Sequence, residues 1–401
     1  MSEVGKLRRR PVRVLVVSHS KVAWGAERVL LSLAPLLLER GFELVLASPG
    51  EGDFARLWSK AGGRHLDRPA PPYGGLRAAG SDKRPSPLAL GKQGRLIVDG
   101  ARQLVQLSRG FDLLHSNSLW SHFEVSLAGR LARTPTVLHV HDLVRPGLGR
   151  VVLGTAVSLA RATAAISTAV GEGIPAFAAR SVTVVPNGVD VDAFSPGSCD
   201  PAVRSELAVS PGPVVGILGR LDPEKGVDTV IAAVSILIRD TAGLIRDTAG
   251  RQVQLAIVGS PMADPAYLRL LESRAAELPE GTVRFVAQRP DVASVMRCLD
   301  VVVNASRAEP FGMTVLEAQS CGIPVVATRT GGLTDVVTDG VDGLLVPAGD
   351  PTALAGAVRR ILGDAALKDS LARQGRRNAE ERFSLAAAAD RMAALYRSVL
   401  G

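Results

Sequence analysis

The sequence predicts an α/β protein with two doubly wound parallel sheets, and three observations lead to this fold class. The 401 residues suffice for two or three domains. Along the whole chain, short apolar runs alternate with stretches in which apolar positions recur at helical spacing. Such continuous runs are typical of parallel strands that are buried on both faces. A segment rich in Pro, Ser and Gly over residues 201–213 separates two sets of this alternation.

The first set opens with a predicted strand at Val12–Val17 and a predicted helix over residues 26–39. Residues 69–94 interrupt the pattern with many Pro and Gly, and a loop of this length inside a compact domain is usually functional or disordered. The other strands of this set are expected at Glu43–Ala47, Leu113–His115, Thr136–Val140, Ala164–Ile166 and Val182–Val185.

The second set ends with an amphipathic helix over residues 385–397. The heptapeptide Leu-Ile-Arg-Asp-Thr-Ala-Gly is repeated without change over residues 237–250, and we assign it no chemistry. The strands of this set are expected at Val214–Leu218, Val253–Val258, Val283–Val286, Val301–Asn304 and Val325–Thr328.

These patterns divide the chain into four segments. We expect an N-terminal domain over residues 1–195, a linker over 196–213, a C-terminal domain over 214–380, and a last helical segment over 381–401 that packs back on the N-terminal domain.

Composition excludes several classes of protein. Hydrophobic residues are 46% and charged residues 21%, which rules out a disordered chain and a disulfide-stabilised miniprotein. No apolar run reaches the roughly 18–20 residues of a membrane span, and we expect no signal peptide. The three cysteines (Cys199, Cys298 and Cys321) lack the spacing of metal ligands and suit a reducing compartment, so we expect a cytoplasmic protein.

Charge is unevenly distributed along the chain. Residues 1–190 carry 25 Lys and Arg against 14 Asp and Glu, a net charge of +11, whereas residues 191–401 have a net charge of −3. A solvated arginine-rich face is the reading that we favour, and an anionic membrane surface, with the protein peripheral at its inner face, is the second. Nucleic acid ranks last, because aromatic residues are only 4% and are not interleaved with basic ones.

Neither predicted sheet carries a familiar phosphate-binding loop. The turn after the first strand, Trp24–Glu27, has one glycine and is too short for the dinucleotide fingerprint GxGxxG. The phosphate loop GxxxxGK[ST] does not occur in the sequence either. A nicotinamide-dependent or ATP-dependent enzyme of the usual kinds is therefore not expected.

The second half offers a different anion site. Arg220 and Lys225 follow the strand Val214–Leu218, just before a helix that begins near Val227. A guanidinium binds phosphate oxygens through its fork, an ammonium acts as a point charge, and a helix N-terminus adds its amides. Taken alone, two such cations in a loop are more often simply solvated.

A second loop of this half adds two carboxylates. A helix is expected to start near Gly312, where the backbone amides of Gly312, Met313 and Thr314 would face a diphosphate. Glu309 precedes this start in the loop, free to face a sugar, and Glu317 lies about a turn and a half into the helix, where a carboxylate can bind two ribose hydroxyls. Each carboxylate alone would be read as a surface charge, but the pair around a glycine helix start favours a site.

Together these motifs resemble the retaining GT-B glycosyltransferases of family 4, also called glycosyltransferase group 1. The resemblance extends from about Val12 to Tyr396 and implies two Rossmann-like domains that face each other across a cleft. The matching segments are Val184–Phe194 (VPNGVD and a following Phe), Gly219–Gly226 (GRLDPEKG), Glu309–Glu317 (the E-x7-E signature), Cys321–Ala327, Gly331-Gly332 and Asp342-Gly343.

The resemblance implies roles for residues of the second half. Arg220 and Lys225 would neutralise the diphosphate of a nucleotide-sugar donor and stabilise the leaving group. Glu317 would bind the ribose and Glu309 the hydroxyls of the transferred sugar. The acceptor hydroxyl would attack from the face that the leaving group vacates, so that the anomeric configuration is retained.

In the first half, the resemblance places Gly25 and His141 at the site. Gly25 stands where the family often has two glycines, and Ala26 departs from that pattern, which weakens the case for a close approach of the phosphates there. His141 matches a histidine near the sugar and the acceptor.

We expect no required metal or cofactor. Asp190-Val191-Asp192 spells a metal–diphosphate motif of another fold, but it lies within the segment that connects the domains. His139 and His141 are expected on opposite faces of their strand, where they could not share an ion.

Alternatives stay open. A nucleotide-sugar epimerase or a glycan phosphorylase would share the two-sheet plan, although lysines are too scarce in the second half to favour the pyridoxal of a phosphorylase. A nucleotide-sugar-binding partner subunit without catalytic activity is the alternative from another class. The base of the donor (UDP, GDP or ADP) and the acceptor, whether glycan, lipid-linked or small molecule, are left undecided.

Overall fold

The computed structural model describes residues 10–50, 52–71, 87–239, 252–260 and 265–401. Most of the loop expected at 69–94 and most of the repeat at 237–250 lie outside these ranges. The chain divides into two compact units, Met1–Pro186 with Ala388–Gly401, and Asn187–Ala387. The expected linker over 196–213 contains helix α7 (Pro201–Leu207) and lies within the second unit.

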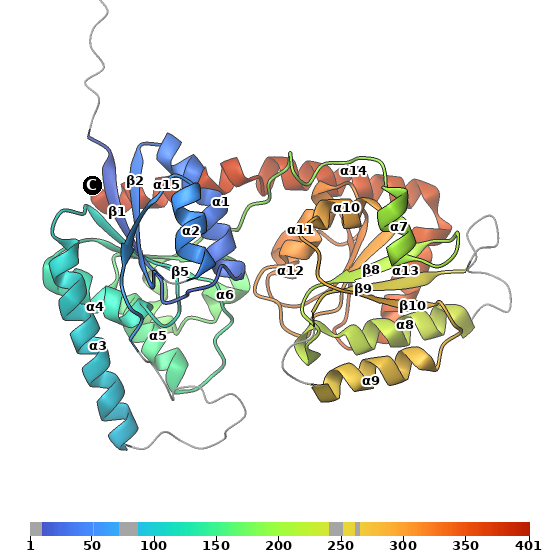
Figure 1. Cartoon of the computed structure of the whole chain (residues 1–401), viewed down its shortest axis with the longest axis horizontal. Coiled ribbons are helices and arrows are strands. Elements are labelled where there is room, and N and C mark those ends of the chain that lie inside the picture. The colour runs from blue at the N-terminus through green and yellow to red at the C-terminus, as the bar shows by residue number, and fades with distance from the viewer. Residues whose placement is uncertain (1–9, 51, 72–86, 240–251, 261–264) are drawn as a thin grey trace, which may run out of the picture. The chain divides into compact units, whose positions relative to one another are not determined.

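The first unit is a parallel sheet of seven strands in the order β3-β2-β1-β4-β5-β6-β7, with helices on both faces (Figure 1). Helices α3 and α4 cover one face, where Leu104 and Val125 pack against Leu15 and Val17 of β1. The elements are β1 (Val12–Val17), α1 (Gly25–Glu39), β2 (Phe42–Ser48), α2 (Asp53–Lys60), β3 (Arg64–Asp67), α3 (Pro87–Ser108), β4 (Leu113–Ser116), α4 (His122–Ala132), β5 (Thr136–Val140), α5 (Leu148–Leu159), β6 (Ala162–Ala165), α6 (Thr168–Glu172), the 3-10 helix η1 (Ala176–Ser181) and β7 (Val182–Val184).

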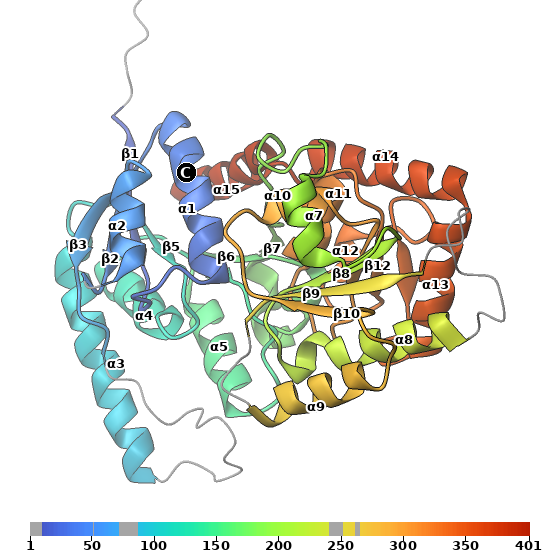
Figure 2. The same cartoon turned by 45° about the vertical axis from the view of Figure 1, so that its right-hand side comes forward.

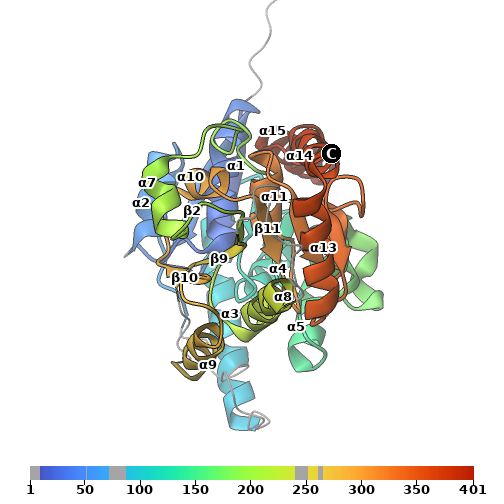
Figure 3. The same cartoon turned by 90° about the vertical axis from the view of Figure 1, so that its right-hand side faces the viewer.

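The second unit is a parallel sheet of six strands in the order β10-β9-β8-β11-β12-β13. Figures 2 and 3 show α8 and α9 on one side of its strands and α10 and α11 on the other. Besides α7, its elements are β8 (Val214–Leu218), the 3-10 helix η2 (Pro223–Lys225), α8 (Val227–Arg239), β9 (Gln254–Val258), α9 (Pro265–Ala276), β10 (Val283–Val286), α10 (Val292–Arg297), β11 (Val301–Asn304), α11 (Met313–Ser320), β12 (Val325–Thr328), α12 (Leu333–Val336), β13 (Leu344–Val346), α13 (Pro351–Gly363) and α14 (Ala365–Arg382).

The last helix, α15 (Leu385–Leu400), crosses the boundary between the units, which falls at Ala387 and Ala388. In the first unit, the Tyr396 hydroxyl lies 2.7 Å from His115 Nδ1, and its ring packs edge-on against Phe42. This part of α15 therefore completes the core of the first unit.

The segment that follows Asn187 is held to the second unit. Arg376 donates hydrogen bonds to the carbonyls of Val191 and Phe194, and a disulfide joins Cys199 to Cys298. Cys321 is a buried free thiol. Because two of the three cysteines are bonded, the cysteine count does not support a reducing compartment.

The predicted fold class is confirmed, since both units have the parallel, Rossmann-like sheets that the alternating pattern indicates. Strands β1, β5, β8, β10, β11 and β12 have the predicted bounds. Strands β3 and β13 were not predicted. Among the helices of the described residues, none combines the length and the apolar composition that a membrane crossing needs.

Candidate functional site

The candidate donor site lies where the strand order of the second sheet reverses. The strands β8 and β11 are neighbours, and the chain runs outward from them in opposite directions, through β9 on one side and β12 on the other. In open α/β sheets, ligands bind at the carboxyl ends of the strands at this switch point. The loops that leave β8 and β11 carry Arg220, Lys225 and Glu309.

The centre of this site is an ion pair between Lys225 and Glu309. Lys225 Nζ lies 2.7 Å from Glu309 Oε2, and the Glu309 residue is only 8% exposed. The same oxygen accepts hydrogen bonds from Ser306 Oγ at 3.0 Å and from Asn304 Nδ2 at 3.4 Å. The structure thus fixes Glu309 through three donors rather than leaving it free in its loop, while a quarter of the Lys225 side chain is exposed.

A second set of contacts braces the two loops against each other. The backbone amide of Arg307 donates to the carbonyl of Glu224, and the Arg307 guanidinium forms an ion pair with Asp228 at 2.8 Å. Arg307 and Tyr267 hold the pKa of the Asp228 carboxyl below its usual value, although burial opposes them. Arg220 is exposed, with its guanidinium 3.5 Å from Asp222. These contacts hold the loops that carry Lys225 and Glu309, while more than half of the Arg220 side chain is exposed.

Glycines let the next loop approach the site closely. A Cβ atom on Gly331, whose φ is +52°, would lie 2.0 Å from the carbonyl oxygen of Glu309. One on Gly332 would lie 2.4 Å from the carbonyl oxygen of Pro310, and the Gly332 amide donates to Glu309. Glycines at these two positions thus have a steric reason, because they let this loop pack against the backbone that carries Glu309.

The start of α11 has the predicted form. Gly312 precedes the helix with a φ of +110°, and Met313 and Thr314 form its first turn. Glu317 is half-buried on this helix, and burial raises the pKa of its carboxyl to about 7. No described residue gives this carboxylate a hydrogen bond or an ion pair.

The two first-half residues lie at the carboxyl edge of the first sheet. His141 directly follows β5, and its Nε2 lies 3.1 Å from Asn117 Oδ1. Asn117 donates in turn to the carbonyl of Ala26 at the start of α1. Gly25 begins α1 and is exposed, and no atom of the described residues would lie within 4 Å of a Cβ there.

Histidines converge beneath this edge. The expectation that His139 and His141 face opposite sides of their strand is wrong: side chains two positions apart share a face, and their ring centroids are 4.0 Å apart. Burial lowers the pKa of His141 to about 3, with a smaller effect of His115. Burial also lowers the pKa of His115 to about 4. The His141 ring is thus neutral at pH 7, so it can form hydrogen bonds but adds no positive charge.

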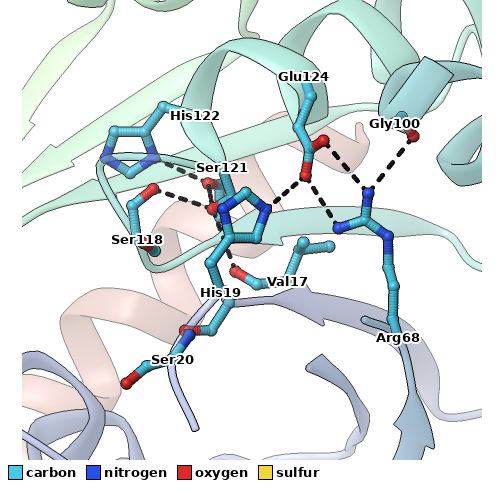
Figure 4. A network of polar contacts seen from close by, with 11 residues as sticks. Val17, His19, Ser20, Arg68, Gly100, Ser118, Ser121, His122 and Glu124 are labelled. Carbon is cyan, nitrogen blue, oxygen red and sulfur yellow. Dashed lines mark hydrogen bonds and ion pairs between the residues drawn. The ribbon is translucent and has the colours of Figure 1, made fainter. Parts of the chain in front are cut away.

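A buried ionic network lies beside the histidines. Figure 4 shows His19 and Arg68 on two sides of the Glu124 carboxylate, whose Oε1 is 2.7 Å from His19 Nε2 and 2.9 Å from Arg68 Nη1. These two partners keep the pKa of Glu124 low in spite of its burial. A Cβ on Gly100 would lie 2.1 Å from Glu124 Oε2, so the glycine makes room for the carboxylate. The network fixes the loop after β1 against α3 and α4.

Comparisons with known proteins identify the family. Residues 24–193 match the sequence model of Glycosyltransferase Family 4, and residues 212–364 match that of Glycosyl transferases group 1. The D-inositol 3-phosphate glycosyltransferase of Jonesia denitrificans is 33% identical over 343 residues, which are 79% of this chain and 77% of the relative. The chain is a family 4 glycosyltransferase.

Other relatives agree with this assignment. The D-inositol 3-phosphate glycosyltransferase of Corynebacterium jeikeium is 39% identical over 54% of this glycosyltransferase and 51% of the relative. The crystal structure of Anabaena HepE with UDP has a TM-score of 0.77 and 25% identity, and covers 96% of this chain and 100% of that one. The fold is therefore of the GT-B type.

The predicted site residues of the glycosyltransferase fall into two groups, one in each unit. Arg220, Lys225, Glu309, Gly312, Met313, Thr314 and Glu317 lie in two loops and one helix start of the second unit, and Gly25 and His141 lie at one edge of the first.

Four residues that hold site residues or their loops in place were not predicted from the sequence, namely Asn117, Glu124, Asn304 and Ser306. For Asn117 and Asn304, their place at the carboxyl end of an apolar run was an available signal.

Proposed function

We propose that this glycosyltransferase moves a hexose from a UDP-sugar to a hydroxyl of an acceptor, with retention of the anomeric configuration and without a required metal or cofactor. The observation that carries the proposal is the Lys225–Glu309 pair at 2.7 Å at the switch point of the second sheet. UDP is favoured because structures of HepE, 25% identical over 96% of this chain, contain UDP and UDP-glucose.

Each donor-side residue has a role that its surroundings support. Arg220, Lys225 and the amides of Met313 and Thr314 would offset the charge that grows on the diphosphate as the sugar leaves. Glu317, which has no partner among the described residues, would accept hydrogen bonds from the ribose hydroxyls. Glu309, already fixed by Lys225, would bind hydroxyls of the transferred sugar.

The transfer step can be balanced with the donor itself as base. The acceptor oxygen forms a bond to the anomeric carbon, the bond from that carbon to the diphosphate oxygen breaks, and UDP leaves with the acceptor proton on a phosphate oxygen. His141 is neutral and held by Asn117, so it would orient a hydroxyl of the sugar or acceptor without adding positive charge. Glu309 is not proposed as a covalent nucleophile, because its carboxylate is bound to Lys225, Ser306 and Asn304.

Calorimetric titration with UDP, GDP and ADP tests the donor site. We expect UDP to bind most tightly, with at least roughly tenfold weaker binding in Lys225→Ala and Glu317→Ala. Lys368→Ala is a matched control, because Lys368 is the other lysine of the second unit and pairs with Asp300 instead. Failure of the folded protein to bind any of the three nucleotides would overturn the donor site, and a preference for GDP or ADP would overturn the choice of UDP.

Product analysis separates the alternatives. NMR spectra of a reaction with UDP-glucose should show UDP and an α-linked glucose product, also in the presence of EDTA. An epimerised nucleotide sugar without release of UDP would establish an epimerase instead. Tight UDP binding with neither transfer nor hydrolysis across a panel of glycan, lipid-linked and small-molecule acceptors would indicate a partner subunit.

A further proposal concerns where the protein acts. We propose that the first unit meets an anionic membrane surface, on the strength of the net charge of +11 in residues 1–190. Fractionation of cells that express the full chain, at low and at high salt, would reveal such an electrostatic association.

A further inference from the structure

Three apolar side chains form an exposed row along α5 of the first unit. Leu148, Val151 and Phe177 are 47, 53 and 64% exposed, and we call them the α5 stripe. Leu148 and Val151 are three residues apart on the helix and therefore share a face. Phe177 comes from η1 and reaches the same helix one turn further on, at Gly154. Single exposed apolar residues are common on proteins, whereas three gathered on one helix and the segment against it mark a candidate contact surface.

The residues around the stripe hold Phe177 against α5 and bury the opposite face of this helix. A Cβ atom on residue 154 would lie 2.6 Å from the ring Cζ of Phe177, so the glycine allows this ring to lie against α5. The opposite face of the helix, with Leu153 and Val157, is buried in the unit. Figures 1 and 2 both show α5 beside α4 at the edge of its layer of helices. The stripe is therefore the outward face of a well-packed helix.

The charge of the segment around the stripe is mostly positive. Residues 143–181 contain four arginines and a single acidic residue, Glu172. Arg145 precedes Leu148 by three residues, Arg150 adjoins Val151, and Arg180 follows Phe177 by three residues. Arg150 donates to the carbonyl of Glu172 at 3.3 Å, which holds its guanidinium near the end of α6.

We propose that the α5 stripe docks the protein on a bilayer that contains anionic lipids. The three apolar side chains would enter the boundary between headgroups and acyl chains, and the arginines would contact the anionic headgroups. The excess of arginine is what favours a membrane over a second copy of this chain, whose identical stripe would bring like charges together. The proposal rests on the membrane association proposed above and names its surface.

Sedimentation with vesicles tests the surface in the full chain. We expect the wild-type protein to bind phosphatidylcholine vesicles that contain phosphatidylglycerol at least roughly tenfold more tightly than vesicles of phosphatidylcholine alone, and to lose this preference at high salt. Val151→Asp and Phe177→Asp should each lower the affinity by roughly tenfold, because a carboxylate would have to enter the interface. Val98→Asp on α3 and Val341→Asp in the second unit, at positions 39 and 49% exposed, are matched controls that should keep the affinity.

The possible outcomes distinguish the α5 stripe as the docking surface from membrane association in general. Equal binding of wild type to both kinds of vesicle would overturn the membrane association and the stripe together. An anionic preference that survives in Val151→Asp and Phe177→Asp but is lost in Val98→Asp would overturn the stripe alone. Dimerisation of the wild type that Phe177→Asp abolishes, without vesicle binding, would assign the stripe to a second copy. Melting temperatures and UDP affinity should be equal in all variants, which keeps the donor site out of the comparison.

Discussion

Replacing Glu317 by Gln should make the protein more stable and weaken its binding of UDP. Burial raises the pKa of this carboxyl to about 7 from the ordinary value of 4.5. A raised pKa in the folded state means that the protonated form folds without penalty below pH 4.5, and that stability is lost as the pH rises through 7. The full difference between the two pKa values corresponds to roughly 3 kcal/mol in the free energy of unfolding, and partial solvent access reduces this penalty to roughly 1–2 kcal/mol. Glutamine keeps the shape and carries no charge, so it removes this penalty above pH 7.

Thermal unfolding at pH 5 and pH 8, with UDP titration at pH 8, would test this reasoning. At pH 8 the Gln variant should melt roughly 2–8 °C above the wild type, and at pH 5 the two should nearly coincide. UDP should bind at least roughly tenfold more weakly, because the charged acceptor for the ribose hydroxyls is gone. Glu272→Gln, at an exposed position of α9, is the control and should change neither quantity. A variant that melts below the wild type at pH 8 would refute a half-buried, unpaired Glu317, and unchanged UDP affinity would refute its role at the ribose.

Three further predictions concern stability. Reduction of the Cys199–Cys298 disulfide, which spans 99 residues, should destabilise the second unit by about 4–5 kcal/mol on a chain-entropy argument; equal melting with and without reductant would contradict it. Burial lowers the pKa of His122 to about 3, so below pH 6.5 the unfolded chain binds a proton at this histidine that the folded chain does not. The stability of the first unit should therefore fall from pH 6.5 toward pH 4, and melting curves of His122→Asn should show a weaker dependence on pH. Gly100→Ala should destabilise the first unit by roughly 2–4 kcal/mol, because the added Cβ clashes with the buried carboxylate of Glu124. Gly94→Ala on the same helix, where a Cβ meets nothing within 4 Å, should stabilise the unit by up to about 1 kcal/mol. Similar melting temperatures of the two variants would show that the clash is relieved at little cost.

Strands were predictable where the sequence buries both of their faces. The run Val12–Val17 and its counterpart Val214–Leu218 are almost wholly apolar, and the structure has strands with these bounds. The strand Arg64–Asp67 escaped prediction because it lies at the edge of its sheet, with both end residues exposed and only Leu66 apolar among its four. Leu344–Val346 has three residues, too few for a pattern to emerge.

The candidate site was predictable in composition but not in connectivity. The spacing of Glu309 and Glu317 around a glycine helix start pointed to a donor site. That Lys225 binds Glu309 could not be derived, because the contact spans 84 positions and depends on β8 and β11 being neighbours. The Glu124 network could not be predicted for the same reason, since His19, Arg68 and Glu124 come from three separate loops and helices.

Helix α15 also bears on how the chain is made. Residues 187–387 of the second unit are contiguous, so they can fold as soon as they have left the ribosome. The first unit needs Ala388–Gly401, where Tyr396 covers His115 and Phe42. Domains usually complete their folding in the order of synthesis. Here the order is reversed: the unit that is translated first is the last to close its core, and until then Tyr396 does not cover His115.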